Sequence, residues 1–164
     1  MKHHARVFYW LPALVWLGII AFESFGLSSD VTGGWLWQLA HWLHIPVSGH
    51  TLIRLNHVLR KVGHFTGYGV LCLFFFRAWF HSLSHGATET MSRFRARCSV
   101  LALCVTLLTA MLDEWHQSFD PTRTGTPRDV ALDCAGGVLF LLAALFVFRA
   151  WRADPEMQRL ATSN

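Results

Sequence analysis

Residues 130–148 read VALDCAGGVLFLLAALFVF, a block in which Asp133 carries the sole charge. A transmembrane helix needs about 20 mostly apolar residues. A soluble amphipathic helix would instead show a charged face with a period of about 3.6 residues, and this block has none. Three further blocks hold at most one charged residue each, at residues 7–27, 62–80 and 98–112. The pattern therefore predicts several helices that span a membrane.

The composition of the whole chain agrees with this interpretation. Of its 164 residues, 53% are hydrophobic and only 15% are charged, and it contains thirteen Phe and eight Trp. Disordered chains show the opposite pattern, with high charge and few aromatic residues. Four Cys in a chain of this length are too few for a disulfide-stapled fold, and the length suits one domain.

We predict an all-α integral membrane bundle of four transmembrane helices, with a short interfacial amphipathic helix between the first two. The spans are expected at about residues 7–27, 62–80, 98–119 and 129–149. Alternation of Trp with Leu around residues 35–43 predicts the interfacial segment, because Trp gathers at membrane–water interfaces. The membrane domain covers residues 1–151, with a retained first span, and residues 152–164 form a polar cytoplasmic tail.

The basic residues predict the orientation. With both termini in the cytoplasm, nine Lys and Arg residues lie inside and five lie outside, which agrees with the positive-inside rule. The five outer ones are Arg54, Arg60, Lys61, Arg123 and Arg128. We therefore predict a multi-pass protein of the cell membrane. Basic residues divided between two sides of a membrane do not form one nucleic-acid footprint, so we expect no nucleic-acid partner.

Ionisable side chains inside a membrane are costly and are therefore functional candidates. In this topology they gather at the outer ends of the last three spans. Helical spacing places Lys61, His64 and Tyr68 on one helix face. It likewise places Asp113 and Gln117 on a shared face of the next span, and Asp129 and Asp133 on a shared face of the last one. The predicted outer-side polar site consists of Lys61, His64, Tyr68, Asp113, Glu114, Gln117, Arg123, Asp129 and Asp133.

Two stretches resemble motifs of VanZ-like membrane proteins. Residues 61–68, KVGHFTGY, are similar to a K-x-x-H-F-x-x-Y element, and residues 113–123, DEWHQSFDPTR, are similar to D-E-x-x-Q-x-F-x-P-x-R. Asp129 and Gly136 fit the continuation D-x-x-x-N-x-x-G, but Asp133 stands where that family usually has Asn. The resemblance implies a small, multi-spanning envelope protein, in a family whose founding member is associated with resistance to teicoplanin.

Several functions remain open from the sequence. The preferred one is binding or modification of an anionic lipid-linked or cell-surface component, with membrane lipids as neighbours. In such a binding site, Arg123 would bind a phosphate or carboxylate bidentately, and Gln117 would be a neutral hydrogen-bond donor. Neither residue is expected to be needed to hold the helix bundle together. The alternative is a structural or accessory protein whose charged cluster is an internal helix clamp. A third is a membrane enzyme with His64 or a carboxylate as general acid or base.

Charge balance separates these functions further. Four carboxylates outweigh Lys61 and Arg123, and this excess favours internal pairing, a bound cation or protonated carboxylates over a simple anion site. The sequence identifies no cofactor. Glu114 and His116 are close along the chain but do not share a helix face, so we predict no metal site. Gly136 and Gly137 predict close approach of another helix and an oligomer contact.

Overall fold

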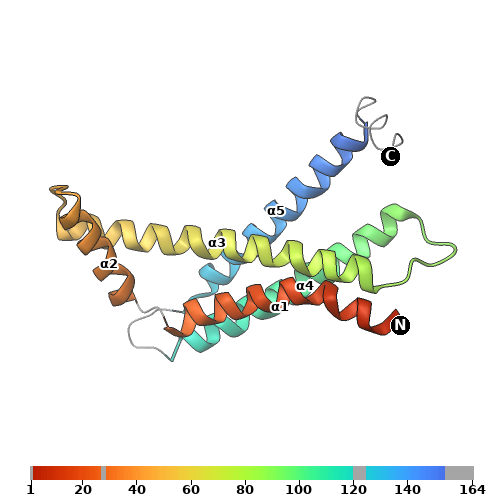
Figure 1. Ribbon diagram of the computed structural model, residues 1–164, viewed down its shortest axis with the longest axis horizontal. Helices are drawn as coiled ribbons and strands as arrows, with labels where there is room; N and C mark the ends of the chain where they lie inside the picture. Colours follow the sequence, from red (N-terminus) through yellow and green to blue (C-terminus); the bar gives the residue numbers. More distant parts are fainter. Residues whose placement is uncertain (1, 27–28, 120–124, 154–164) are drawn as a thin grey trace.

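A computed structural model describes residues 2–26, 29–119 and 125–153, and these residues form five α-helices and no strand (Figure 1). The all-α prediction is therefore confirmed over the described ranges. Arg123 and the tail beyond residue 153 lie outside them. The helices are α1 (Lys2–Gly26), α2 (Ser29–Trp42), α3 (Gly49–Ser82), α4 (Met91–Gln117) and α5 (Pro127–Ala153).

Helix α3 is the central element, because it contacts each of the other four helices. Helices α1, α3, α4 and α5 run in alternating directions, so α1 begins and α5 ends toward one end of the bundle (Figure 1). Helix α2, the end of α4 and the start of α5 lie at the opposite end. The C-terminal half of α5 diverges from α3, and most of its side chains are exposed.

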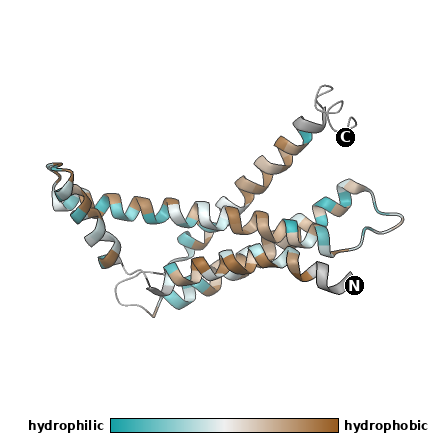
Figure 2. Cartoon of the chain, viewed as in Figure 1, coloured by the Kyte–Doolittle hydropathy of each residue, from teal (hydrophilic) through white to brown (hydrophobic). Residues whose placement is uncertain are grey.

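Three helices are long and apolar enough to cross a membrane, within residues Val7–Ser24, Met91–Gln117 and Pro127–Arg149. These correspond to three of the four predicted spans. Helix α3 does not meet the same criterion, so the structure does not confirm the fourth span. The physical reason is visible in Figure 2, where hydrophilic residues gather in the half of α3 nearest α2. Some of these polar residues, such as Asn56, are buried within the bundle, and others, such as Arg54 and His57, are exposed.

The helices are longer than predicted at their N-terminal ends. Helix α3 begins at Gly49 rather than at residue 62, because the Ser48 side chain accepts a hydrogen bond from the Thr51 backbone N–H at 3.2 Å. Leu52 and Asn56 on the added turns are buried. Helix α4 begins at Met91 rather than at residue 98, and the Thr90 side chain caps it in the same way. The predicted amphipathic segment is the helix α2, whose interfacial location stays a prediction.

Helices α3 and α5 approach each other closely at Gly136. A Cβ atom at this position would lie 2.1 Å from the backbone oxygen of Phe65, so any larger residue would push the helices apart. The close approach predicted for Gly136 and Gly137 is therefore made by α3 of the same chain. This glycine face, which was expected to receive a second copy, is covered within the chain. Oligomerisation itself stays a prediction.

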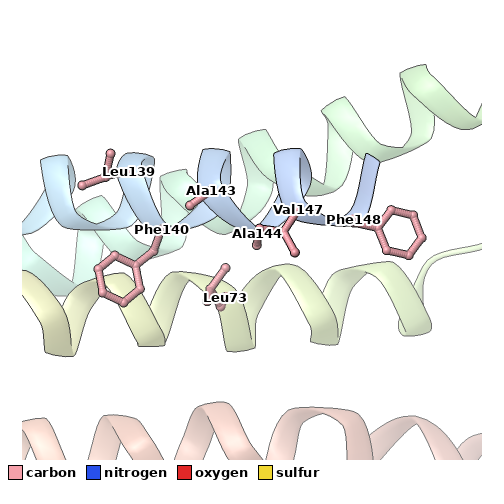
Figure 3. Close-up of a pocket in the computed structure, with 7 residues that line it drawn as sticks. All are labelled: Leu73, Leu139, Phe140, Ala143, Ala144, Val147 and Phe148. Carbon is pink, nitrogen blue, oxygen red and sulfur yellow. The ribbon is translucent and has the colours of Figure 1, made fainter. Parts of the chain in front are cut away.

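Farther along the same two helices, where α5 diverges, lies an apolar groove of about 650 Å³ (Figure 3). Its walls are entirely hydrophobic, formed by Leu73, Leu139, Phe140, Ala143, Ala144, Val147 and Phe148. A groove of this composition suits hydrocarbon and offers no group for polar chemistry. The polar side chains of the predicted site lie instead toward the opposite end of the bundle.

Candidate functional site

The structure brings eight of the nine predicted site residues together, where the first half of α3 meets the end of α4 and the start of α5. The ninth, Arg123, lies outside the described residues. We call the eight the polar cluster, and its members are Lys61, His64, Tyr68, Asp113, Glu114, Gln117, Asp129 and Asp133. The polar cluster has three parts, which differ in how their carboxylates are paired.

The first part is an ion pair that is partly open to solvent. The Lys61 ammonium donates to Oδ1 of Asp129 at 2.7 Å, and the two side chains are 42% and 23% exposed. Internal pairing, one of the possibilities that the charge balance favoured, is thus present between Lys61 and Asp129. The Thr126 hydroxyl donates to the second Asp129 oxygen at 2.8 Å. Both carboxylate oxygens of Asp129 are therefore paired.

The second part is a hydrogen-bonded network around Asp113. Tyr68 donates its hydroxyl to Oδ2 of Asp113 at 3.0 Å, and Ser24 donates to Oδ1. Gln117 in turn donates its amide to the Ser24 hydroxyl at 3.2 Å. The network joins α1, α3 and α4, and we call these four residues the Asp113 network.

Two details of the Asp113 network were not foreseen. Gln117 was not expected to help hold the bundle, but it is buried and donates a hydrogen bond to Ser24 of α1. The reason is that its helix face points toward α1. Ser24 was missed because a serine at the end of an apolar block is a weak signal. The adjacent Glu23 looked more informative, yet its side chain is exposed.

The third part surrounds Asp133, which is fully buried. Neither of its carboxylate oxygens has a hydrogen-bond partner among the described residues. Nδ1 of His64 lies 3.6 Å from Oδ2, which is within ion-pair distance but too long for a hydrogen bond. Asp133 is thus the most buried carboxylate of the polar cluster and also the least paired.

Glu114 completes this third part. Its side chain is 6% exposed, and one oxygen accepts the Thr126 backbone N–H at 2.9 Å. This bond ties α4 to the residue before α5. The connection passes very close to α4 at Gly125, where a Cβ atom would lie 2.3 Å from the Glu114 backbone oxygen. We call His64, Glu114 and Asp133 the Asp133 triad, since each offers one ligand atom within 4.8 Å of the other two.

A groove of about 240 Å³ between α1, α2 and α3 reaches His64, one member of this triad. Its lining is mixed: Glu23, Thr32, Leu36, Asn56, Leu59, Arg60, Gly63 and His64. The position of Gly63 is open, because a Cβ atom there would meet nothing within 4 Å. Of the polar cluster, His64 is the member that lines this groove.

Comparison with known proteins gives one family. The model described as VanZ/LLP1 matches residues 8–149, a range that includes all helices of the bundle and the whole polar cluster. No curated protein and no solved structure matches the chain significantly.

Proposed function

The chain belongs to the VanZ/LLP1 family, and from this premise we propose that it is an envelope membrane protein that binds an anionic lipid-linked or cell-surface component. The groove between α1, α2 and α3 is the observation that carries the proposal. It combines the apolar side chains of Leu36 and Leu59 with the guanidinium of Arg60. Such a lining suits a molecule with a hydrocarbon part and a phosphate or carboxylate.

By charge balance the groove is a better anion site than the polar cluster, because its lining sets Arg60 against one carboxylate, that of Glu23. In the cluster, Lys61 is engaged by Asp129, and three further carboxylates would repel an anion. Arg60 lies one residue before Lys61 and lines the groove, which ends at His64. The head group is therefore held near Arg60, with His64 beside it as the group that would act in any modification.

Lipid retention tests this function. The protein is purified in detergent and incubated with polyprenyl phosphate or with phosphatidylcholine, and native mass spectrometry measures the bound fraction. We expect polyprenyl phosphate to be retained and Arg60→Gln to lower its bound fraction several-fold. Arg128→Gln is the matched control, because Arg128 is exposed outside the groove. Equal retention of the two lipids, or equal loss in both variants, would refute the proposal.

The membrane arrangement is part of the proposal. The chain crosses the cell membrane four times, with α2 at the outer interface and both termini in the cytoplasm. Helix α1 begins and α5 ends toward the same end of the bundle (Figure 1). This arrangement supports an even number of membrane crossings. Exposed Trp35, Trp37 and Trp42 on α2 support the interfacial placement.

Single-cysteine labelling tests this arrangement, after Cys72, Cys98, Cys104 and Cys134 have been replaced. Arg128→Cys and Ala87→Cys place exposed thiols at opposite ends of the bundle. An impermeant maleimide should label Arg128→Cys in intact cells and Ala87→Cys only after permeabilisation. The reverse result would invert the orientation.

A structural role is the second candidate function. The Asp113 network and the pair of Lys61 with Asp129 favour it, since both join different helices and leave no oxygen of these carboxylates unpaired. Susceptibility to teicoplanin-type glycopeptides separates the two candidates in cells. Under the binding function, Arg60→Gln changes susceptibility while the amount of folded protein stays the same. Under the structural role, susceptibility follows only the amount of folded protein.

A further inference from the structure

Among the described residues, the buried carboxylate of Asp133 has His64 as its candidate positive partner, at 3.6 Å and without a hydrogen bond. Its two oxygens accept no hydrogen bond among the described residues, although the side chain is fully buried. Burying a charge is tolerated when it is paired or when it coordinates a metal. The nearest Lys of the polar cluster, Lys61, is already paired with Asp129 at 2.7 Å.

We propose that the Asp133 triad binds a divalent transition-metal ion, such as Zn²⁺ or Mn²⁺. An imidazole nitrogen with two carboxylates is a ligand set that these ions accept. The two carboxylates carry two negative charges when ionised, and a divalent ion neutralises them. The triad combines α3, α4 and α5, so the ion would also join the three helices around the polar cluster.

The spacing of the triad is close to what coordination needs. Bonds of about 2.0–2.2 Å allow two ligand atoms of one ion to lie no more than about 4.4 Å apart. The nitrogen Nδ1 of His64 and Oδ2 of Asp133 are 3.6 Å apart, already inside this limit. The three ligand atoms lie within 4.8 Å of one another, so shifts of a few tenths of an ångström would bring all of them inside this limit.

Two neighbouring features fit a metal site. The backbone N–H of Thr126 holds one oxygen of Glu114 and leaves the other available, as hydrogen bonds to ligating carboxylates do in metal sites. The groove between α1, α2 and α3 reaches His64, which provides an entry path. Three protein ligands also leave coordination positions open for water or an anion, as in catalytic metal centres.

A protonated His64 paired with Asp133 is the competing explanation. It would supply one positive charge, but at 3.6 Å it makes no hydrogen bond and leaves Glu114 without a counter-charge from the triad. The two explanations predict different metal contents, so they can be separated without knowledge of the physiological ligand.

The experiment measures metal binding by the full chain in detergent. Protein stripped with a chelator is dialysed against Zn²⁺, Mn²⁺ or Mg²⁺, and the bound ion is determined by elemental analysis. We expect one equivalent of Zn²⁺ or Mn²⁺, and a higher melting temperature upon its addition. Asp133→Asn and Glu114→Gln should each weaken binding by at least about tenfold, since changes even outside the ligand shell reach that size.

Glu23→Gln is the matched control, because Glu23 is an exposed acidic residue of the groove and not a member of the triad. It should bind the ion like the wild type. Wild-type protein without bound Zn²⁺ or Mn²⁺, or Asp133→Asn and Glu114→Gln with undiminished binding, would overturn the proposal. The result is independent of the lipid-binding function, since the probe is the metal alone and Arg60 is not a ligand.

Discussion

Asp113 and Asp133 are two carboxylates of one polar cluster with opposite surroundings. Asp113 accepts hydrogen bonds from Tyr68 and Ser24 on its two oxygens. Asp133 is fully buried and accepts none among the described residues. A satisfied buried network stabilises a fold, whereas an unsatisfied polar group costs free energy. This difference is consistent with the structural role proposed for the Asp113 network and with the metal site proposed for the Asp133 triad.

The largest effect is expected when the satisfied carboxylate is removed. Asp113→Ala leaves the buried hydroxyl of Tyr68 without its acceptor and releases Ser24. We expect a loss of about 2–4 kcal/mol in the free energy of unfolding, since hydrogen bonds to charged groups are strong. Unfolding in detergent monitored by circular dichroism measures it. Asp30→Ala, at an exposed position of α2, is the control and should change little. An unchanged stability of Asp113→Ala would remove the structural role of the network.

Replacement of Asp133, the carboxylate without a hydrogen bond, should raise the free energy of unfolding. With metal removed by a chelator, Asp133→Asn eliminates a buried charge that has no hydrogen-bond partner. We expect the free energy of unfolding to rise by about 1–2 kcal/mol, because an amide is cheaper to bury than a carboxylate. The same detergent unfolding assay, performed with the chelator present, provides the measurement. A loss of stability would mean that Asp133 is held by charged His64, and it would contradict the proposed metal site.

The pair of Lys61 and Asp129 should behave as a weaker version of the Asp113 network. Its side chains are partly exposed, so Lys61→Met should cost about 1 kcal/mol or less. The double variant Lys61→Met with Asp129→Asn should recover folded yield, because it removes both charges. Fluorescence-detected size exclusion measures the yield. If Lys61→Met combined with Asp113→Asn recovers the folded yield to the same extent, the pairing of Lys61 with Asp129 is not specific.

The smallest change concerns the edge of the Asp113 network. Gln117→Ala removes one hydrogen bond, the donation from Gln117 to Ser24 at 3.2 Å. We expect a loss of about 1 kcal/mol in the free energy of unfolding, with metal content unchanged. Parallel unfolding and elemental analysis test both parts. A lower metal content would show that the two halves of the cluster are coupled.

Much of this molecule was predictable from local sequence. The uncharged blocks predicted helices that can cross a membrane, and three of them meet that criterion. The spacing of polar residues predicted that three helix ends share one cluster, which the contacts of Lys61, Tyr68 and His64 confirm. The second span was predicted from residue 62, and helix α3 extends beyond it to Gly49, where the Ser48 cap and the burial of Leu52 stabilise the additional turns.

The sequence by itself determined the helical class and the family, because apolar block length and motif spacing are properties of the chain alone. It also determined that carboxylates exceed cations in the cluster. Only the tertiary structure decided which carboxylate is paired: Asp113 meets Ser24 from α1, and Asp133 meets His64 and Glu114. The reason is that pairing depends on the rotation and distance of packed helices, and no spacing along one helix encodes these. The Asp133 triad draws one residue from each of three helices, so packing alone assembles it.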